Sequence, residues 1–175
     1  GLRGAVITRT DMPGVDQLIQ WAPASVLLTV FVITGVANAV NIIDGFNGLA
    51  SMCVLMMILA LGYVAFQVGD TFIFTAALIT AGAVLGFFVW NFPAGLIFLG
   101  DGGAYLLGFL LGELSILLVH RNASVSPMFP LLLCAYPIFE TIFTMYRRKV
   151  VRGVATADPD GIHLHTLIHR RLIRW

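Results

Sequence analysis

The chain has 175 residues, of which 59% are hydrophobic and 11% are charged, and its mean hydropathy is +0.94. Soluble domains carry about 25% charged residues, so this composition excludes a water-soluble globule. The net charge is only +1, but seven of the ten basic residues lie in the last 29 positions, which is typical of one membrane face and argues against a nucleic-acid partner.

Three long uncharged runs dominate the first part of the chain. They lie between Asp16 and Asp44, between Asp44 and Asp70, and between Asp70 and Asp101, and they contain 27, 25 and 30 residues. A bilayer is crossed by about 20 apolar residues, and the crossing segments must be helices because lipid offers the backbone no partners. Windows of about 19 residues predict five transmembrane helices, at 24–43, 49–68, 71–91, 103–119 and 127–146.

The fold class predicted is therefore an all-α integral membrane protein, a polytopic helical bundle. Residues 1–175 form a single membrane domain, which we expect to be the C-terminal portion of a larger bundle. Seven basic residues after the last span against three on the other face place the tail, 147–175, in the cytoplasm. Counting back along the spans, the loops at 44–48 and 92–102 are also cytoplasmic, and residues 1–22 are extracytoplasmic.

Small residues spaced by four predict close helix packing. Gly82 and Gly86 on the third span, and Ala104, Gly108 and Gly112 on the fourth, form stripes that let neighbouring helices approach. We give these stripes no catalytic role.

The first polar cluster lies at the cytoplasmic end of the first span. A spacing of three places Asn38, Asn41 and Asp44 along one side of a helix, and Asn47 follows in a glycine-containing turn. Asp44 and Asn47 are also ordinary turn residues. Asn38 and Asn41 lie deeper, where amides are costly and tend to be functional.

The second cluster, residues 98–103, precedes the fourth span and contains Asp101 between glycines. One interpretation is a helix N-cap, for which Asp is favoured. The other is a ligand for Mg²⁺, which is usually held by one or two carboxylates together with substrate phosphates.

The third cluster is the basic tail. Arg147 and Arg148 follow the fifth span, and basic residues at that place are often orientation signals or contacts with anionic lipid. His163 and His165 would share one side of an extended loop, and His165 and His169 one side of a helix. Such pairs suit zinc or phosphate, although the tail has no cysteine and no H-E-x-x-H pattern to support zinc.

Two glutamates interrupt the predicted spans and favour a different class of function. Glu113 lies about 18 Å past Asp101 along its helix, and Glu140 lies within about 10 Å of the cytoplasmic end. Intramembrane acids are typical of proton or ion paths, so a transporter or channel fragment is the alternative hypothesis. Pro130 and Pro137 predict a kink in the fifth span that aims Glu140 inward.

Together the three clusters resemble the polyprenyl-phosphate N-acetylhexosamine-1-phosphate transferase family, of the glycosyl transferase family 4 type, whose members begin bacterial cell-envelope glycans. The family segment N-x-x-N-x-x-D-G-x-[DN]-G-L matches Asn38, Asn41, Asp44, Gly45, Asn47, Gly48 and Leu49. The segment G-D-x-G matches Gly100, Asp101 and Gly103. The segments P-x-x-[DE]-T, R-R and H-L-H-H match Pro137, Glu140, Thr141, Arg147, Arg148, His163, Leu164 and His165, with Thr166 in the last position.

The resemblance implies a magnesium-dependent transferase, with Mn²⁺ as an alternative ion, in the bacterial cytoplasmic membrane. Its substrates would be a UDP-N-acetylhexosamine and polyprenyl (undecaprenyl) phosphate, with UMP released, and a homodimer is left open. Asp101 would bind the metal. Catalytic roles fall to Asp101, Asp44, His163 and His165, and substrate-binding roles to Asn38, Asn41, Asn47, Arg147, Arg148 and His169.

One motif spelling and one missing motif qualify this expectation. The H-L-H spelling is closer to the branch that starts O-antigen, enterobacterial common antigen and teichoic-type polymers, which favours lipopolysaccharide or related cell-wall glycans over peptidoglycan. The family's Asp-Asp pair has no counterpart in this sequence, so a catalytically incompetent remnant is a further alternative.

Overall fold

Seven helices follow one another along residues 6–147 and 149, the part of the chain that the computed structural model describes. They are α1 (Val15–Leu18), α2 (Ala22–Ile43), α3 (Leu49–Gln67), α4 (Thr71–Asn91), α5 (Gly100–Arg121), α6 (Met128–Leu133) and α7 (Ala135–Tyr146). In this part of the chain, α2 to α5 are each long and apolar enough to cross a membrane. The predicted all-α, multi-pass membrane fold is confirmed, and the first four predicted spans agree with these helices to within a few residues.

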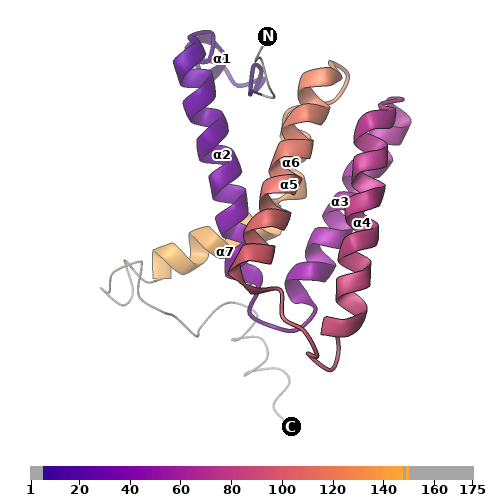
Figure 1. The fold of residues 1–175 in the computed structure, drawn as a ribbon. Coiled ribbons are helices and arrows are strands. Elements are labelled where there is room, and N and C mark those ends of the chain that lie inside the picture. Colours follow the sequence, from indigo (N-terminus) through magenta and orange to yellow (C-terminus); the bar gives the residue numbers. More distant parts are fainter. Residues whose placement is uncertain (1–5, 148, 150–175) are drawn as a thin grey trace.

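The four long helices form two antiparallel pairs, α2 with α5 and α3 with α4 (Figure 1). The predicted stripe on α5 allows the first pair to approach closely: a Cβ added at Gly108 would lie 2.5 Å from the Cα of Ala37, closer than real atoms come. One turn further, the same atom at Gly112 would lie 3.6 Å from the Cα of Ile33. The prediction for α5 is therefore confirmed, and α2 lies directly on the glycine side of α5.

The corresponding prediction for α4 was wrong for the described residues. A Cβ added at Gly82 or Gly86 would meet no atom within 4 Å, and both glycines are exposed. The buried side of α4 is a different one, on which Ala77 faces Gly62 of α3. It carries Ile73, Ala77, Ala81 and Val84. Spacing by four marks a smooth helix face but does not say whether another helix covers it.

The fifth predicted span, 127–146, is not one continuous helix. It is divided at Cys134 into α6 and α7, and α7 lies across the lower end of α2 at a steep angle to the long helices (Figure 1). Pro137 explains the break, because it has no N–H for the carbonyl of Leu133 and its ring clashes with that carbonyl. The predicted inward direction of Glu140 is confirmed, since its exposed fraction is 0%.

A polar cluster joins the two helix pairs at the end of the bundle opposite Asp101. Asp70 caps α4 by accepting from the backbone N–H of Ile73 at 3.1 Å. Its carboxylate also accepts from Arg121 Nε at 2.7 Å and from Asn122 Nδ2 at 3.0 Å, both at the end of α5. We call this the Arg121 end of the bundle and the opposite one the Asp101 end.

The glycine contact between α2 and α5 makes a direct prediction. Gly108→Ala should lower the free energy of unfolding by about 1–3 kcal/mol, because the new methyl group overlaps the backbone of Ala37. Gly82→Ala is the matched control and should leave stability unchanged or slightly raised, since that site is open. Thermal unfolding of the purified full protein in detergent measures both, and equal melting temperatures would contradict the packing described.

Candidate active site

Two connections that the sequence predicts on one side of the membrane lie together at the Asp101 end of the bundle (Figure 1). One is the turn between α2 and α3, residues 44–48, and the other is the segment between α4 and α5, residues 92–99. The close packing of α2 on α5 aligns the last turn of α2 with the first turn of α5. Two of the three predicted clusters therefore meet.

The contact between these clusters is a hydrogen bond from Asn41 Nδ2 to Asp101 Oδ1, 3.0 Å long. It joins residues 60 positions apart in the sequence. Asp101 lies in the first turn of α5, whose N-cap residue is Leu99 and has no capping side-chain bond. The N-cap interpretation of Asp101 is therefore wrong, and its exposed carboxylate is aimed at the end of α2.

Asp44 supplies a second carboxylate at the same end. It follows the last residue of α2 and is half-buried, and this burial raises the pKa of its carboxyl group above the ordinary value, with the negative charge of Asp101 as a second cause. Two carboxylates that repel each other favour a cation between them. Asn38 and Asn47, the other predicted members, are exposed.

The structure also identifies a buried residue to which the sequence analysis gave no role. Asn91, the last residue of α4, is 6% exposed. Its Oδ1 accepts from the backbone N–H of Gly48 at 2.6 Å, and its Nδ2 donates to the carbonyl of Ile97 at 2.8 Å. One amide side chain thus holds both connections. In the sequence, Asn91 is only an amide residue at the end of an apolar run. An ordinary helix terminus gives the same pattern, so the sequence did not mark this residue.

Close contacts between glycines and side chains complete the junction between the two connections. Gly48 has φ +82°, and a Cβ there would lie 2.9 Å from the ring of Phe92. Gly95 has φ +63°, and a Cβ there would lie 2.5 Å from Asn47 Nδ2. Both positions need glycine for their positive φ, and Gly48 needs it also for space, because the ring of Phe92 lies against it. The two connections therefore form one packed unit next to Asp101, and Asp44 is part of it.

The third predicted cluster is described only at its start. Arg147 is the C-cap residue of α7 and is 9% exposed. Arg148, His163, His165 and His169 lie outside the described residues. Within the described part of the chain, no group of three or more His, Cys, Asp or Glu side chains gathers as a metal site. The oxygen donors near one another are the carboxylates of Asp44 and Asp101 and the amide of Asn41.

Comparison with known proteins places the chain in a family. The family model described as glycosyl transferase family 4 matches residues 3–119, two thirds of the chain. The chain belongs to glycosyl transferase family 4. The resemblance stated from the three motifs is thereby confirmed, and the matched residues include both Asp44 and Asp101.

Three curated relatives of this family 4 chain come from bacteria. It is 34% identical to a probable undecaprenyl-phosphate N-acetylglucosaminyl 1-phosphate transferase of Bacillus subtilis, over 79% of this chain and 38% of the relative. It is 33% identical to a decaprenyl-phosphate N-acetylglucosaminephosphotransferase of Mycolicibacterium smegmatis, over 91% of this chain and 43% of the relative. It is 43% identical to a phospho-N-acetylmuramoyl-pentapeptide-transferase of Streptococcus thermophilus, over 57% of this chain and 29% of the relative. The chain thus spans less than half the length of these relatives, and no solved structure matches it.

The role of Asn91 in this family 4 chain is testable through stability. Asn91→Leu keeps the branched outline of the side chain but leaves the buried N–H of Gly48 without its acceptor, so the free energy of unfolding should fall by about 1–3 kcal/mol. Trp90→Leu, at an exposed neighbouring position, is the control and should change it by no more than about 0.5 kcal/mol. Limited proteolysis within residues 92–99 should be faster in Asn91→Leu only; equal cleavage in both variants would show that the amide does not hold this segment.

Proposed function

We propose that the full protein transfers an N-acetylhexosamine-1-phosphate from a UDP-sugar to polyprenyl phosphate at the cytoplasmic face of the membrane and releases UMP. The observation that carries this proposal is the hydrogen bond between Asn41 and Asp101, because it unites two motifs of the transferase family at one end of the bundle. The printed names of the relatives, which describe undecaprenyl- and decaprenyl-phosphate transferases, agree with it.

The residues present fit a magnesium ion. Asp101 and Asp44 offer hard oxygen donors, Asp101 is open to substrate, and the mutual repulsion that helps to raise the pKa of Asp44 would be relieved by a cation. Mg²⁺ is usually held by one or two carboxylates plus substrate phosphates, so this pair suffices without a larger protein cage. When bound, Mg²⁺ would supply neutralisation of the diphosphate charge, and Mn²⁺ is the alternative ion.

The reaction asks the protein mainly to position its substrates. An oxygen of the polyprenyl phosphate attacks the sugar-linked phosphorus of the UDP-sugar, and the bond from that phosphorus to the oxygen of UMP breaks. Asn38, Asn41 and Asn47 would orient nucleotide and sugar by hydrogen bonds, at the ends of rigid or well-packed elements. We assign Arg147, Arg148, His163, His165 and His169 to the phosphates, from their match to the family motifs.

The membrane location has its own chemical reason, since a polyprenyl chain is dissolved in the bilayer. Asp44 and Asp101 lie at helix ends, where a lipid head group and a water-soluble nucleotide can both reach them. A transport path would instead need its polar groups near the middle of the helices. Neither of the two intramembrane acids belongs to the two connections. Glu113 is half-buried on α5, and Glu140 lies on the broken α6–α7 segment.

The decisive experiment measures UMP release from UDP-N-acetylglucosamine in membranes that contain the full protein and added polyprenyl phosphate. Release should require Mg²⁺, and Asp101→Asn should lower its rate by at least about 100-fold, as expected when charge stabilisation of the transferring group is lost. Glu113→Gln is the control variant and should keep the rate within about threefold.

Two outcomes would contradict the proposal. Unchanged release by Asp101→Asn would remove this carboxylate from the mechanism. UMP release by the wild-type full protein no greater than that of membranes without it would remove the transferase activity itself and favour the transport hypothesis. Repeating the assay with a UDP-N-acetylmuramoyl-pentapeptide donor separates the branches. Our proposal expects the N-acetylhexosamine donor to be preferred, in line with the H-L-H spelling at His163–His165.

A further inference from the structure

Asn41 is bonded to both residues that supply carboxylates at the Asp101 end of the bundle. Its side-chain Nδ2 donates to Asp101 Oδ1 at 3.0 Å, and its backbone carbonyl accepts from the N–H of Asp44 at 3.2 Å. The first bond links α2 to the first turn of α5, and the second closes the last turn of α2. One residue thus connects the two carboxylates to which the proposed metal site is assigned.

The turn that carries Asn41 is fixed by packing. Asn41 is half-buried, and its neighbours Val40 and Ile43 are both 0% exposed. One turn earlier, Ala37 is the residue whose backbone lies against Gly108 of α5. The amide is therefore held by a rigid part of the bundle, and its donor group is presented at a set position.

Asp101 has much less support of its own. Its carboxylate is exposed on the first turn of α5, and the two residues that follow it, Gly102 and Gly103, have no side chains to pack against it. Within the described part of the chain, the one hydrogen bond to this carboxylate comes from Asn41. An exposed carboxylate without other contacts can adopt several rotamers. The bond from Asn41 selects one of them and leaves Oδ2 without a donor.

The type of donor suits a metal ligand. A primary amide is neutral, so Asn41 orients the Asp101 carboxylate without repelling a divalent cation, as a lysine or arginine at the same place would. Hydrogen-bond partners of ligating carboxylates are a usual part of metal sites, and their loss typically costs about 10–100-fold in metal affinity or activity. The second N–H and the oxygen of the amide remain for the substrate contact proposed above.

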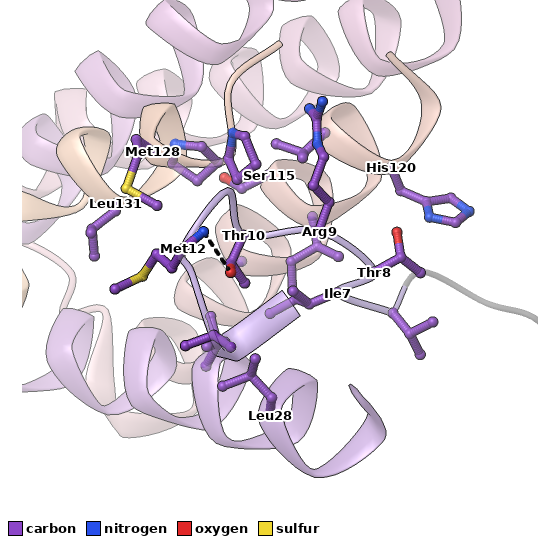
Figure 2. Close-up of a pocket in the computed structure, with 18 of the residues that line it drawn as sticks. Ile7, Thr8, Arg9, Thr10, Met12, Leu28, Ser115, His120, Met128 and Leu131 are labelled. Carbon is purple, nitrogen blue, oxygen red and sulfur yellow. Dashed lines mark hydrogen bonds between the residues drawn. The ribbon is translucent and has the colours of Figure 1, made fainter. Parts of the chain in front are cut away.

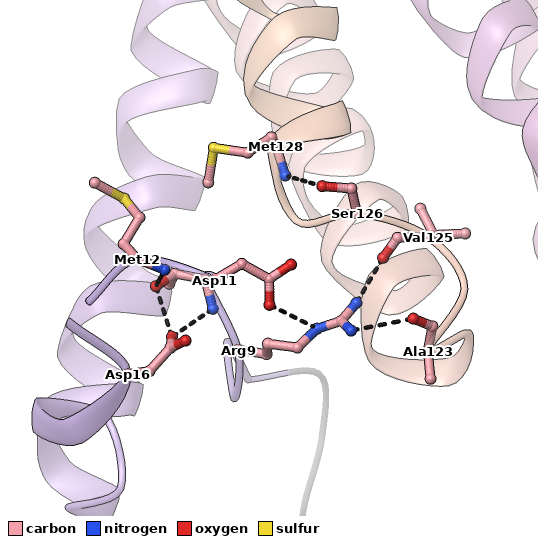
Figure 3. Close-up of polar contacts among 9 residues, drawn as sticks. Arg9, Asp11, Met12, Asp16, Ala123, Val125, Ser126 and Met128 are labelled. Carbon is pink, nitrogen blue, oxygen red and sulfur yellow. Dashed lines mark hydrogen bonds and ion pairs between the residues drawn. The ribbon is translucent and has the colours of Figure 1, made fainter. Parts of the chain in front are cut away.

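Carboxylates at the opposite end of the bundle have different partners. Asp11 pairs with the guanidinium of Arg9 at 3.6 Å (Figure 3). Asp16 accepts from the N–H and the hydroxyl of Thr10, only six positions away, and so closes a local turn. The apolar cavity of about 550 Å³ at that end has no carboxylate among the described residues that line it (Figure 2). These carboxylates are paired with a cation or held within one segment, unlike Asp101.

We propose that Asn41 is a positioning residue for the metal, whose amide orients the Asp101 carboxylate and leaves Oδ2 free for the divalent cation. This inference rests on the proposed function, because it concerns the ion that the transfer reaction would use. It goes beyond that proposal because it gives Asn41 an effect on metal binding that is independent of any substrate.

The test measures Mn²⁺ binding to the purified full protein in detergent, without nucleotide or lipid substrate, from the electron paramagnetic resonance signal of free Mn²⁺. The site is defined as the binding that Asp101→Asn removes. Asn41→Leu, which keeps the branched outline of the side chain but has no donor, should weaken this binding by at least about tenfold. Asn41→Ala should weaken it to a similar extent, and this variant carries the test if Asn41→Leu fails to fold.

Two control variants separate this effect from a general loss of structure. Thr10→Val is the matched control, because it also removes a side-chain donor from a carboxylate, that of Asp16. Asp70→Asn is the control for stability, since it weakens the contacts with Arg121 and Asn122 far from the site. Both variants should bind Mn²⁺ within about twofold of the wild type, as expected for distant, independent positions.

The UMP-release assay gives a second readout. Loss of the Asn41 donor should raise the Mg²⁺ concentration needed for half-maximal release by a factor similar to the loss of Mn²⁺ affinity, and it should change the rate at saturating Mg²⁺ less. A residue that only held α2 against α5 would not produce this difference.

Three results would overturn the proposal: no Mn²⁺ binding that Asp101→Asn removes, binding by both Asn41 variants equal to the wild type, or equal weakening in Asp70→Asn. The second result would leave Asn41 with a substrate contact alone, and the third would assign the effect to stability. Failure of the proposed function gives a different result, namely Mn²⁺ binding that depends on Asn41 in a protein that releases no UMP.

Discussion

The arrangement of this chain depends on the close contact between α2 and α5. At Gly108 the surface of α5 has no side chain, and the backbone of α2 at Ala37 occupies the space that a Cβ would need. This contact sets the height of one helix against the other, and one turn beyond Ala37 on α2 lies Asn41, which donates to Asp101. The contact of Gly108 with the backbone of α2, in the apolar part of the bundle, thus determines which polar groups meet at the end of the bundle.

The polar groups at that end are supported by a second layer of contacts in the connections. Asn91 binds the backbone of both connections, and the glycines at 48 and 95 leave room for the ring of Phe92 and the amide of Asn47. Asp44 and Asp101 are therefore presented by a fixed unit even though each lies at or beyond a helix end. Such preorganisation is what phosphoryl transfer requires, because positioning and charge neutralisation supply most of its catalysis.

Sequence patterns predicted most of the fold because lipid makes hydrophobic length a strict requirement, and charges such as Asp44 and Asp70 mark where each span ends. Counting the spans back from the tail also predicted that Asp44 and Asp101 lie on the same side of the membrane. The patterns did not reveal which face of a helix is covered, so Gly82 was misassigned. They predicted a kink at Pro130 and Pro137, but not that the last span divides into two helices at Cys134. Asn91 was missed because its partner backbone lies 43 residues away.

The central claim is that the end of α2 and the start of α5 meet at Asn41 and Asp101. The most direct measurement is cross-linking of the full protein with Asn41→Cys and Asp101→Cys, after replacement of Cys53 and Cys134, by a short bifunctional thiol reagent. Our account predicts rapid intramolecular cross-linking of this pair and none when Gly82→Cys replaces Asn41→Cys. Absence of a cross-link between positions 41 and 101, with both thiols still reactive towards a monofunctional reagent, would contradict it.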